Sequence, residues 1–229
     1  MAERHIDLNA DLGEEVTDDV ALLHVVTSAN VACGYHAGNE QIMRAVCDEA
    51  AERGVSVGAQ VSYDDRANFG RVAVDVAADV LRDQVADQVG TLSAIAVRAG
   101  TAVRYVKPHG ALYHRVIDDP LQADAVLAGS GDLPVLGMPG ELLAAATAVG
   151  RRVLREGFAD RGYGADGRLL PRSEPGALLD DLDEIAAHAV ALAPDVDSVC
   201  VHGDSPAAVR AAAAVRSALE AGGWTLRGL

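Results

Sequence analysis

Short strand-like runs alternate along this chain with longer amphipathic stretches rich in Ala, Val and Leu. The short runs are typical of β-strands, and the longer ones have the spacing of helices. We expect seven strands, at residues 5–11, 28–34, 55–61, 103–109, 133–138, 151–158 and 197–203.

The stretches between most of these strands predict helices. In residues 40–54 the pattern places Ile42, Val46 and Ala50 on one face, and Gly54 is a stop signal. Residues 74–100 form the longest helical stretch. Residues 206–223 close the chain, with Pro206 suited to a first helical turn.

Strands that alternate with helices pair in parallel, because each helical crossover returns the chain in the same direction. An open doubly wound sheet fits this pattern. Seven units in 229 residues favour instead an α/β fold with an irregular seven-stranded, TIM-barrel-like (β/α) barrel. No linker or low-complexity segment interrupts the chain, so we expect one domain over residues 1–229.

Polar side chains gather at the carboxyl ends of the expected strands. They include Asn9, Asp11 and Glu14, then His36 and Asn39, then Gln60, Tyr63 and Asp65, then Lys107, His109 and Tyr113, then Asp160 and Arg161, and finally His202 and Asp204. Barrel enzymes build their active sites at the carboxyl ends of the strands. The pattern therefore indicates a chain that binds and transforms a ligand.

Lys107 is the only lysine, whereas the other 18 of the 19 basic Lys and Arg residues are arginine. It lies at a strand end between Val106 and Pro108, where partial burial is expected. A compact ammonium differs there from a planar guanidinium in size, donor geometry and pKa. It can bind a phosphate or polarise a carbonyl oxygen.

Each of these residues also has a structural interpretation. Asp11 could cap a helix, Asp65 and Asp204 could serve turns or caps, and Glu156, Asp160 and Arg161 could form only a structural ion pair. His36, His109 and His202 could be satisfied without a ligand. We interpret His5, His24, His114 and His188 as structural.

The composition limits the classes of molecule that the protein is expected to bind. The net charge is −15, from 34 acidic and 19 basic residues, and such a surface repels nucleic acid and anionic membranes. Three cysteines without a CxxC pair do not make a disulfide framework. From the polar amino terminus we expect no signal peptide, and no apolar run reaches the length of about 18 residues that a membrane helix needs. We expect a cytoplasmic protein that binds a small ligand or a protein partner.

Five stretches carry a family resemblance. They read "DLNADLGE", "SANVACGYHAGN", "VKPHGALYH", "FADRGYGADGRLLPRS" and "VCVHGDSPAAV", and they span residues 7–209. In this order they resemble the LamB/YcsF family. The resemblance implies a barrel related to the polysaccharide-deacetylase superfamily. Members of established function form the A-subunit of an ATP-dependent 5-oxoprolinase, which with subunits B and C converts 5-oxo-L-proline, ATP and water to L-glutamate, ADP and phosphate.

A lactam is a poor electrophile, so phosphorylation of its oxygen would drive ring opening. We expect Lys107 and Arg161 to hold phosphate or oxyanion charge, and His109 or His36 to act as base or acid. Asp11 would orient a histidine or water, or bind the Mg²⁺ carried with ATP. Asp160, His202 and Asp204 would complete the site. The remaining expected substrate-binding residues are Asn9, Asn30, Gln60, Tyr63, Asp65, Tyr113 and Arg172.

The chain departs from the family pattern at several places. The loop after Glu14 and the stretch 114–137 are short, Asn39 replaces an acid, and Gln60 stands where related deacetylases have a metal-binding histidine. Glutamine is a poor ligand for transition metals, so we predict no zinc-type centre; Asp11 and His109 are the candidates if an ion binds.

Two alternatives stay open. One is an ATP-independent, metal-dependent amide hydrolase or deacetylase with Asp11, His36 and His109 as ligands. The other is a non-catalytic, ligand-binding subunit of a larger complex. Replacing Lys107 by Met should cut turnover by orders of magnitude and leave the fold intact.

Overall fold

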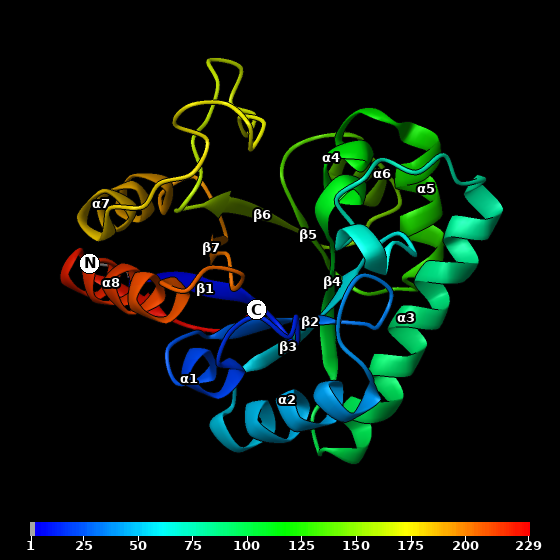
Figure 1. Ribbon diagram of the computed structural model, residues 1–229, viewed down its shortest axis with the longest axis horizontal. Coiled ribbons are helices and arrows are strands. Elements are labelled where there is room, and N and C mark those ends of the chain that lie inside the picture. Colours follow the sequence, from blue (N-terminus) through cyan, green and yellow to red (C-terminus); the bar gives the residue numbers. More distant parts are fainter. Residues whose placement is uncertain (1–2) are drawn as a thin grey trace.

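The computed structural model describes residues 3–229 and contains one parallel sheet that closes into a barrel (Figure 1). The strands are β1 (Arg4–Leu12), β2 (Ser28–Ala32), β3 (Ser56–Val61), β4 (Val103–Pro108), β5 (Val135–Gly137), β6 (Val153–Phe158), β7 (Ser198–Val201) and β8 (Trp224–Leu226). Strands β1 to β7 follow one another around the barrel, and β1 pairs with both β2 and β7. The predicted seven-stranded, irregular (β/α) barrel is confirmed.

Strand β8 is an addition that the sequence pattern did not predict. It pairs with the first residues of β1 and therefore lies at the amino end of the barrel. Beyond it, Leu229 packs against Tyr105, Leu136 and Leu154. Three residues after a Gly-Gly pair are too short a run to stand out as a strand.

Helices surround the barrel (Figure 1). They are α1 (Asp19–Leu23), α2 (Glu40–Arg53), α3 (Ala78–Arg98), α4 (Gly110–Asp118), α5 (Pro120–Gly129), α6 (Glu141–Ala148), α7 (Leu182–Leu192) and α8 (Ala208–Ala221), with a short 3₁₀ helix η1 (Arg66–Asn68). As predicted, α2 ends at Gly54, which has a left-handed φ of 69°. Pro206 was placed wrongly: α8 begins at Ala208, and Pro206 lies in the preceding turn.

The side chains of β1 alternate between two environments. Ile6, Leu8, Ala10 and Leu12 join the large aliphatic core, whereas the residues between them face the polar barrel interior. We call this interior group the polar column: Asp7, Asn9, Asp11, Asn30, Lys107 and Glu156. All six are buried, so their polar groups need partners: Asp7 accepts from Thr27, Ser28 and Ser198, and the other five bond or pair with one another.

Within residues 3–229, no helix has the length and apolar character that crossing a membrane requires. All eight strands belong to one sheet. That residues 1–229 form a single domain stays a prediction.

Candidate functional site

A pocket of about 410 Å³ opens at the carboxyl ends of the strands, where β1, β4, β6 and β7 place polar side chains. Its polar lining consists of Asp11, Arg71, Lys107, His109, Tyr113, His114, Arg161, Arg172 and His202. Part of the wall comes from the segment between β6 and α7, which extends past the end of β6 in Figure 1. That segment is pinned by an antiparallel bridge between Arg161 and Leu178.

Lys107 lies at the floor of the pocket with only 2% of its surface exposed. Its ammonium is 2.8 Å from Glu156 Oε1 and donates to Asp11 Oδ1 at 3.1 Å. Burial alone would lower the pKa of Lys107, but the attraction of Asp11 and Glu156 outweighs it and holds that pKa well above its usual value. Lys107 is therefore a fixed positive charge, and neither a base nor a nucleophile at neutral pH.

The polar column continues below Lys107. Asn9 donates to Glu156 at 3.1 Å and accepts from Asn30 at 2.7 Å. Asn30 also donates to Asp11 at 2.8 Å, which fixes that carboxylate beside the lysine. These amides support the charges at the pocket floor and do not line the pocket themselves.

His202 and Asp160 form a pair at the pocket wall. The ring Nδ1 of His202 is 2.9 Å from Asp160 Oδ1, and the backbone N–H of His202 donates to the same carboxylate. Burial would lower the pKa of His202, but Asp160 and, more weakly, Asp11 outweigh it and raise that pKa. The ring stacks on Phe158, with the ring centroids 5.2 Å apart. His202 is thus held in one orientation and is readily protonated.

Three arginines add positive charge to the wall. Arg161 is buried, and its Nε and Nη2 donate to the carbonyls of Ala177 and Leu170, which fixes the plane of its guanidinium. Arg71 pairs with Asp204, whose carboxylate is 3.8 Å from Arg172. Asp204 therefore holds the arginines and does not itself line the pocket.

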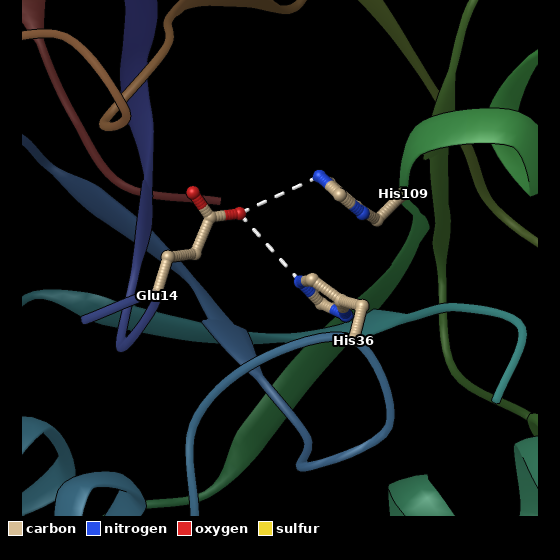
Figure 2. A group of neighbouring side chains, drawn as sticks. All are labelled: Glu14, His36 and His109. Atoms are coloured by element: carbon tan, nitrogen blue, oxygen red, sulfur yellow. Dashed lines mark ion pairs between the residues drawn. The ribbon is translucent and has the colours of Figure 1, made fainter. Parts of the chain in front are cut away.

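A second cluster of polar atoms borders the pocket at His109. Figure 2 shows Glu14, after β1, directed toward the rings of His36, after β2, and His109, after β4. Burial raises the pKa of Glu14, with His36 partly offsetting the effect. Burial and the neighbouring His36 and Arg71 hold the pKa of His109 well below its usual value. Gln60 donates to Glu14 Oε1 at 2.9 Å.

The loop after β3 presses on this cluster. Asp65 accepts from Asn68 and the N–H of Val72, which shapes the loop. The loop brings Gly70, at a left-handed φ of 66°, so close that a Cβ there would lie 2.9 Å from the Cβ of His36. Only glycine fits this approach without displacement.

Residues 6–229 match the model of the LamB/YcsF family. The chain belongs to this family. A protein of Streptomyces coelicolor, named as the A-subunit of 5-oxoprolinase, is 54% identical over 242 residues, covering 95% of this chain and 97% of that protein. One of the same name from Mycobacterium avium is 52% identical, covering 97% and 98%.

Solved structures share the fold of this chain. The lactam utilization protein of Thermus thermophilus superposes with a TM-score of 0.92 at 32% identity, covering 98% of this chain and all of that one. A peptidoglycan N-acetylglucosamine deacetylase of Eubacterium rectale superposes at 0.55 with 13% identity, covering all of this chain and 89% of that one, and shares the fold alone.

The structure brings most of the expected site residues of this family member together. Asp11, Lys107, His109, Tyr113, Arg161, Arg172 and His202 line the pocket, and Asn9, Asn30, His36, Gln60, Asp160 and Asp204 contact that lining or the cluster beside it. Tyr63 lies elsewhere: its hydroxyl donates to Gln122, and its ring joins the aliphatic core. Asp65 shapes a loop and does not line the pocket.

Two acidic residues, Glu14 and Glu156, make contacts at the site that the sequence analysis did not predict. Glu14 faces both histidines, a position that Asp11 was expected to take, whereas Asp11 pairs with Lys107. Glu156 joins Lys107 to Tyr113, whose hydroxyl donates to it at 2.9 Å. The sequence did hold a signal for Glu156. It is two residues from both Leu154 and Phe158, and residues two apart share a face of a strand, so Glu156 could have been expected on the same buried face as these two.

Proposed function

We propose that this chain is the A-subunit of an ATP-dependent 5-oxoprolinase, which opens 5-oxo-L-proline to L-glutamate. The observation that carries the proposal is the identity of about half of all positions, over nearly the full length, to proteins that bear this name. The pocket supports it, because a cationic, partly apolar cavity suits a small lactam that carries a carboxylate.

The proposed reaction consumes ATP and two water molecules and yields glutamate, ADP and phosphate. The γ-phosphoryl group goes to the lactam oxygen, and water adds to the activated carbon. The carbon–nitrogen bond then breaks, and a second water hydrolyses the resulting acyl phosphate. ATP, as its Mg²⁺ complex, supplies the phosphoryl group in the assembly with subunits B and C, which we place in the cytoplasm.

The sequence contains no Walker-type glycine–lysine loop, so the proposed role of this chain is to hold the lactam and its oxyanions. Lys107 is a permanent charge that Asp11 and Glu156 keep in place, so no reorganisation is needed as negative charge develops. Arg161, whose orientation two backbone carbonyls fix, would bind the carboxylate or the phosphoryl oxygens.

His202 would donate the proton that the ring nitrogen needs when it leaves. Its raised pKa and its hydrogen bond to Asp160 suit a general acid near neutral pH. His202 lines the same pocket as Lys107, so both face the same bound molecule.

A second candidate is amide hydrolysis by a metal-bound water without ATP. The cluster of Glu14, His36 and His109 beside the pocket favours it. The dependence of glutamate formation on ATP separates the two candidates.

The test is to mix this chain with its cognate B and C subunits and to follow ADP and glutamate together. We expect both products in equal amounts, only with 5-oxoproline and only when this chain is present. Glutamate formed without ATP would favour the second candidate. Full activity without this chain would contradict both.

A further inference from the structure

The contacts between Glu14 and the two histidines are too long for hydrogen bonds. Glu14 Oε1 is 3.6 Å from His36 Nε2 and 3.5 Å from His109 Nε2, whereas N–H···O bonds span about 2.7–3.2 Å. Three ligand atoms, one from each residue, lie within 4.8 Å of one another. They converge on one space without bonding across it (Figure 2).

These separations match the edge of a coordination sphere. Zinc binds imidazole nitrogen and carboxylate oxygen at about 2.0–2.1 Å, so two ligands of a tetrahedral ion lie about 3.3–3.4 Å apart. The observed 3.5 and 3.6 Å exceed this by a few tenths of an ångström. The two ring nitrogens lie within 4.8 Å of each other, and the rings, which are stacked at an interplanar angle of 18°, would have to tilt as well as shift to direct both lone pairs at one ion.

Several polar atoms of the cluster have no partner in the part of the chain that the structure describes. They are both ring nitrogens of His36, Nδ1 of His109 and Oε1 of Gln60. The three residues are at most 7% exposed. A buried polar group without a partner costs about 1–3 kcal/mol, and of these four atoms His36 Nε2 is the one that an ion between Glu14 and the two histidines would bind.

Packing limits the movement of the two rings. They stack with centroids 4.0 Å apart, and Phe69 packs against both in a T-shaped arrangement. Gln60 donates to Glu14 Oε1 and orients the carboxylate. Ligands fixed in this way bind an ion without a large ordering cost.

We propose that Glu14 Oε1, His36 Nε2 and His109 Nε2 bind one divalent transition-metal ion of the zinc class. Two imidazoles and one carboxylate are a donor set of catalytic zinc sites, which keep a further position open for water. Because His109 also lines the pocket, the open position would face the bound ligand. This proposal departs from the sequence-based prediction of no zinc-type centre, which rested on Gln60: Gln60 orients Glu14 and is not itself a ligand, and Glu14 takes the place expected for Asp11.

The inference goes beyond the proposed function and does not rest on it. In a 5-oxoprolinase, the bound ion would supply an activated water or polarise the lactam carbonyl. Metal binding itself needs neither ATP nor the other subunits, so it can be measured on this chain alone.

The experiment uses the full chain without an affinity tag, treated with a chelator and then dialysed against Zn²⁺ or Co²⁺. Metal content is measured by mass spectrometry, and the Co²⁺ form by visible absorption. We expect one equivalent per chain and the intense absorption of a four- or five-coordinate Co²⁺ site. Mg²⁺, which prefers six oxygen ligands, should not compete.

The decisive variants are Glu14→Gln, His36→Asn and His109→Asn, with circular dichroism to verify folding. Each should weaken Zn²⁺ binding by about 100-fold or more, since loss of even a supporting residue costs 10–100-fold. His5→Asn is the matched control, because His5 is exposed and lies at the opposite, amino end of the barrel. This variant should bind Zn²⁺ as the wild type does.

Failure of the wild-type chain to hold one equivalent would overturn the proposal. So would three folded variants that keep it, since the ion would then be at another site. If a variant does not fold, the Co²⁺ spectrum of the wild type still decides, because a six-coordinate, weakly absorbing ion would contradict the assigned ligands. None of these outcomes depends on whether the chain acts on 5-oxoproline.

Discussion

Lys107 shows how much one residue depends on its surroundings. Its ammonium forms ion pairs with Asp11 and Glu156, both of which are buried, and Tyr113 donates a hydrogen bond to the same Glu156. The residue therefore serves the fold and the pocket together. Composition pointed to Lys107, but its partners Asp11 and Glu156 come from strands far apart in sequence.

Lys107→Met should lower turnover of the assembled enzyme by at least about 100-fold, because a fixed charge at the developing oxyanion is lost. The structure also changes the expectation that the fold stays intact. Two buried carboxylates would lose their counter-charge, at a cost of about 3–5 kcal/mol in the free energy of unfolding. Steady-state kinetics and urea unfolding measure the two effects.

The double variant Lys107→Met/Glu156→Gln is the control for this prediction. It removes one of the two orphaned charges, so part of the stability should return while turnover stays low. Near-normal turnover of the variant Lys107→Met alone would exclude Lys107 from the chemistry.

Asp160→Asn should lower the pKa of His202. The carboxylate that raises this pKa is removed, whereas burial, which lowers it, remains. Protonated His202 is favoured in the folded protein, so activity that needs it is present at low pH and declines as pH rises through that pKa. In the variant, this decline should begin at lower pH. The pH profile of turnover, together with NMR titration of the ring, measures the shift.

Asp204→Asn is the comparison for this titration, since Asp204 pairs with Arg71 and not with His202. An unchanged pH profile in Asp160→Asn would remove His202 from the role of general acid.

At the scale of elements, the start of helix α2 explains one departure from the family pattern, the asparagine at position 39. Asn39, where many relatives were expected to carry an acid, is the N-cap of α2 and accepts from the backbone N–H groups of Gln41 and Ile42. Asparagine and aspartate cap helices about equally well. The replacement therefore preserves the start of α2.

Asn39→Ala should lower the free energy of unfolding by about 1 kcal/mol and the melting temperature by about 2–4 °C. Asn39→Asp should leave both nearly unchanged, since its carboxylate accepts the same bonds. Thermal unfolding followed by circular dichroism checks both variants. Equal losses in the two would mean that the cap is not what the side chain contributes.

At the scale of the whole molecule, the sequence was enough to predict the seven strands, their parallel order and the face on which the pocket lies. Strand periodicity and barrel topology carry that information. It was not enough to decide which polar side chains meet. Tyr63 and Asp65 come soon after Gln60, which lies near the end of β3, yet Tyr63 turns into the aliphatic core and Asp65 into its own loop.

The pairing of Glu14 with both histidines was equally out of reach, because it depends on the path of a loop rather than on a periodic pattern. The same holds for Glu156, which is placed by strand register across the barrel. Such contacts between distant segments have no local signal in a single sequence.

The barrel interior should make global stability depend on pH through Asp7. Burial raises the pKa of Asp7 to about 6, despite bonds from Ser198, Ser28 and Thr27. A raised pKa means that the folded state binds the proton more tightly, so this contribution is present in acid and is lost as pH rises through about 6. Between pH 5 and 7 the loss should be about 1 kcal/mol.

Urea unfolding of the wild type and Asp7→Asn at several pH values tests this prediction. The difference between the two should change with pH in the stated direction, whatever constant offset the substitution adds. A difference that does not vary between pH 5 and 7 would contradict it.

The burial of the only lysine also determines how the folded protein reacts with reagents that modify lysine side chains. Reagents that acylate lysine find no such side chain on its surface, since Lys107 is 2% exposed and ion-paired inside the barrel. Acylation of that amine requires the strands to separate. The rate at which a labelling reagent modifies Lys107 would therefore report opening of the barrel, with one chemical mark for each molecule that has opened.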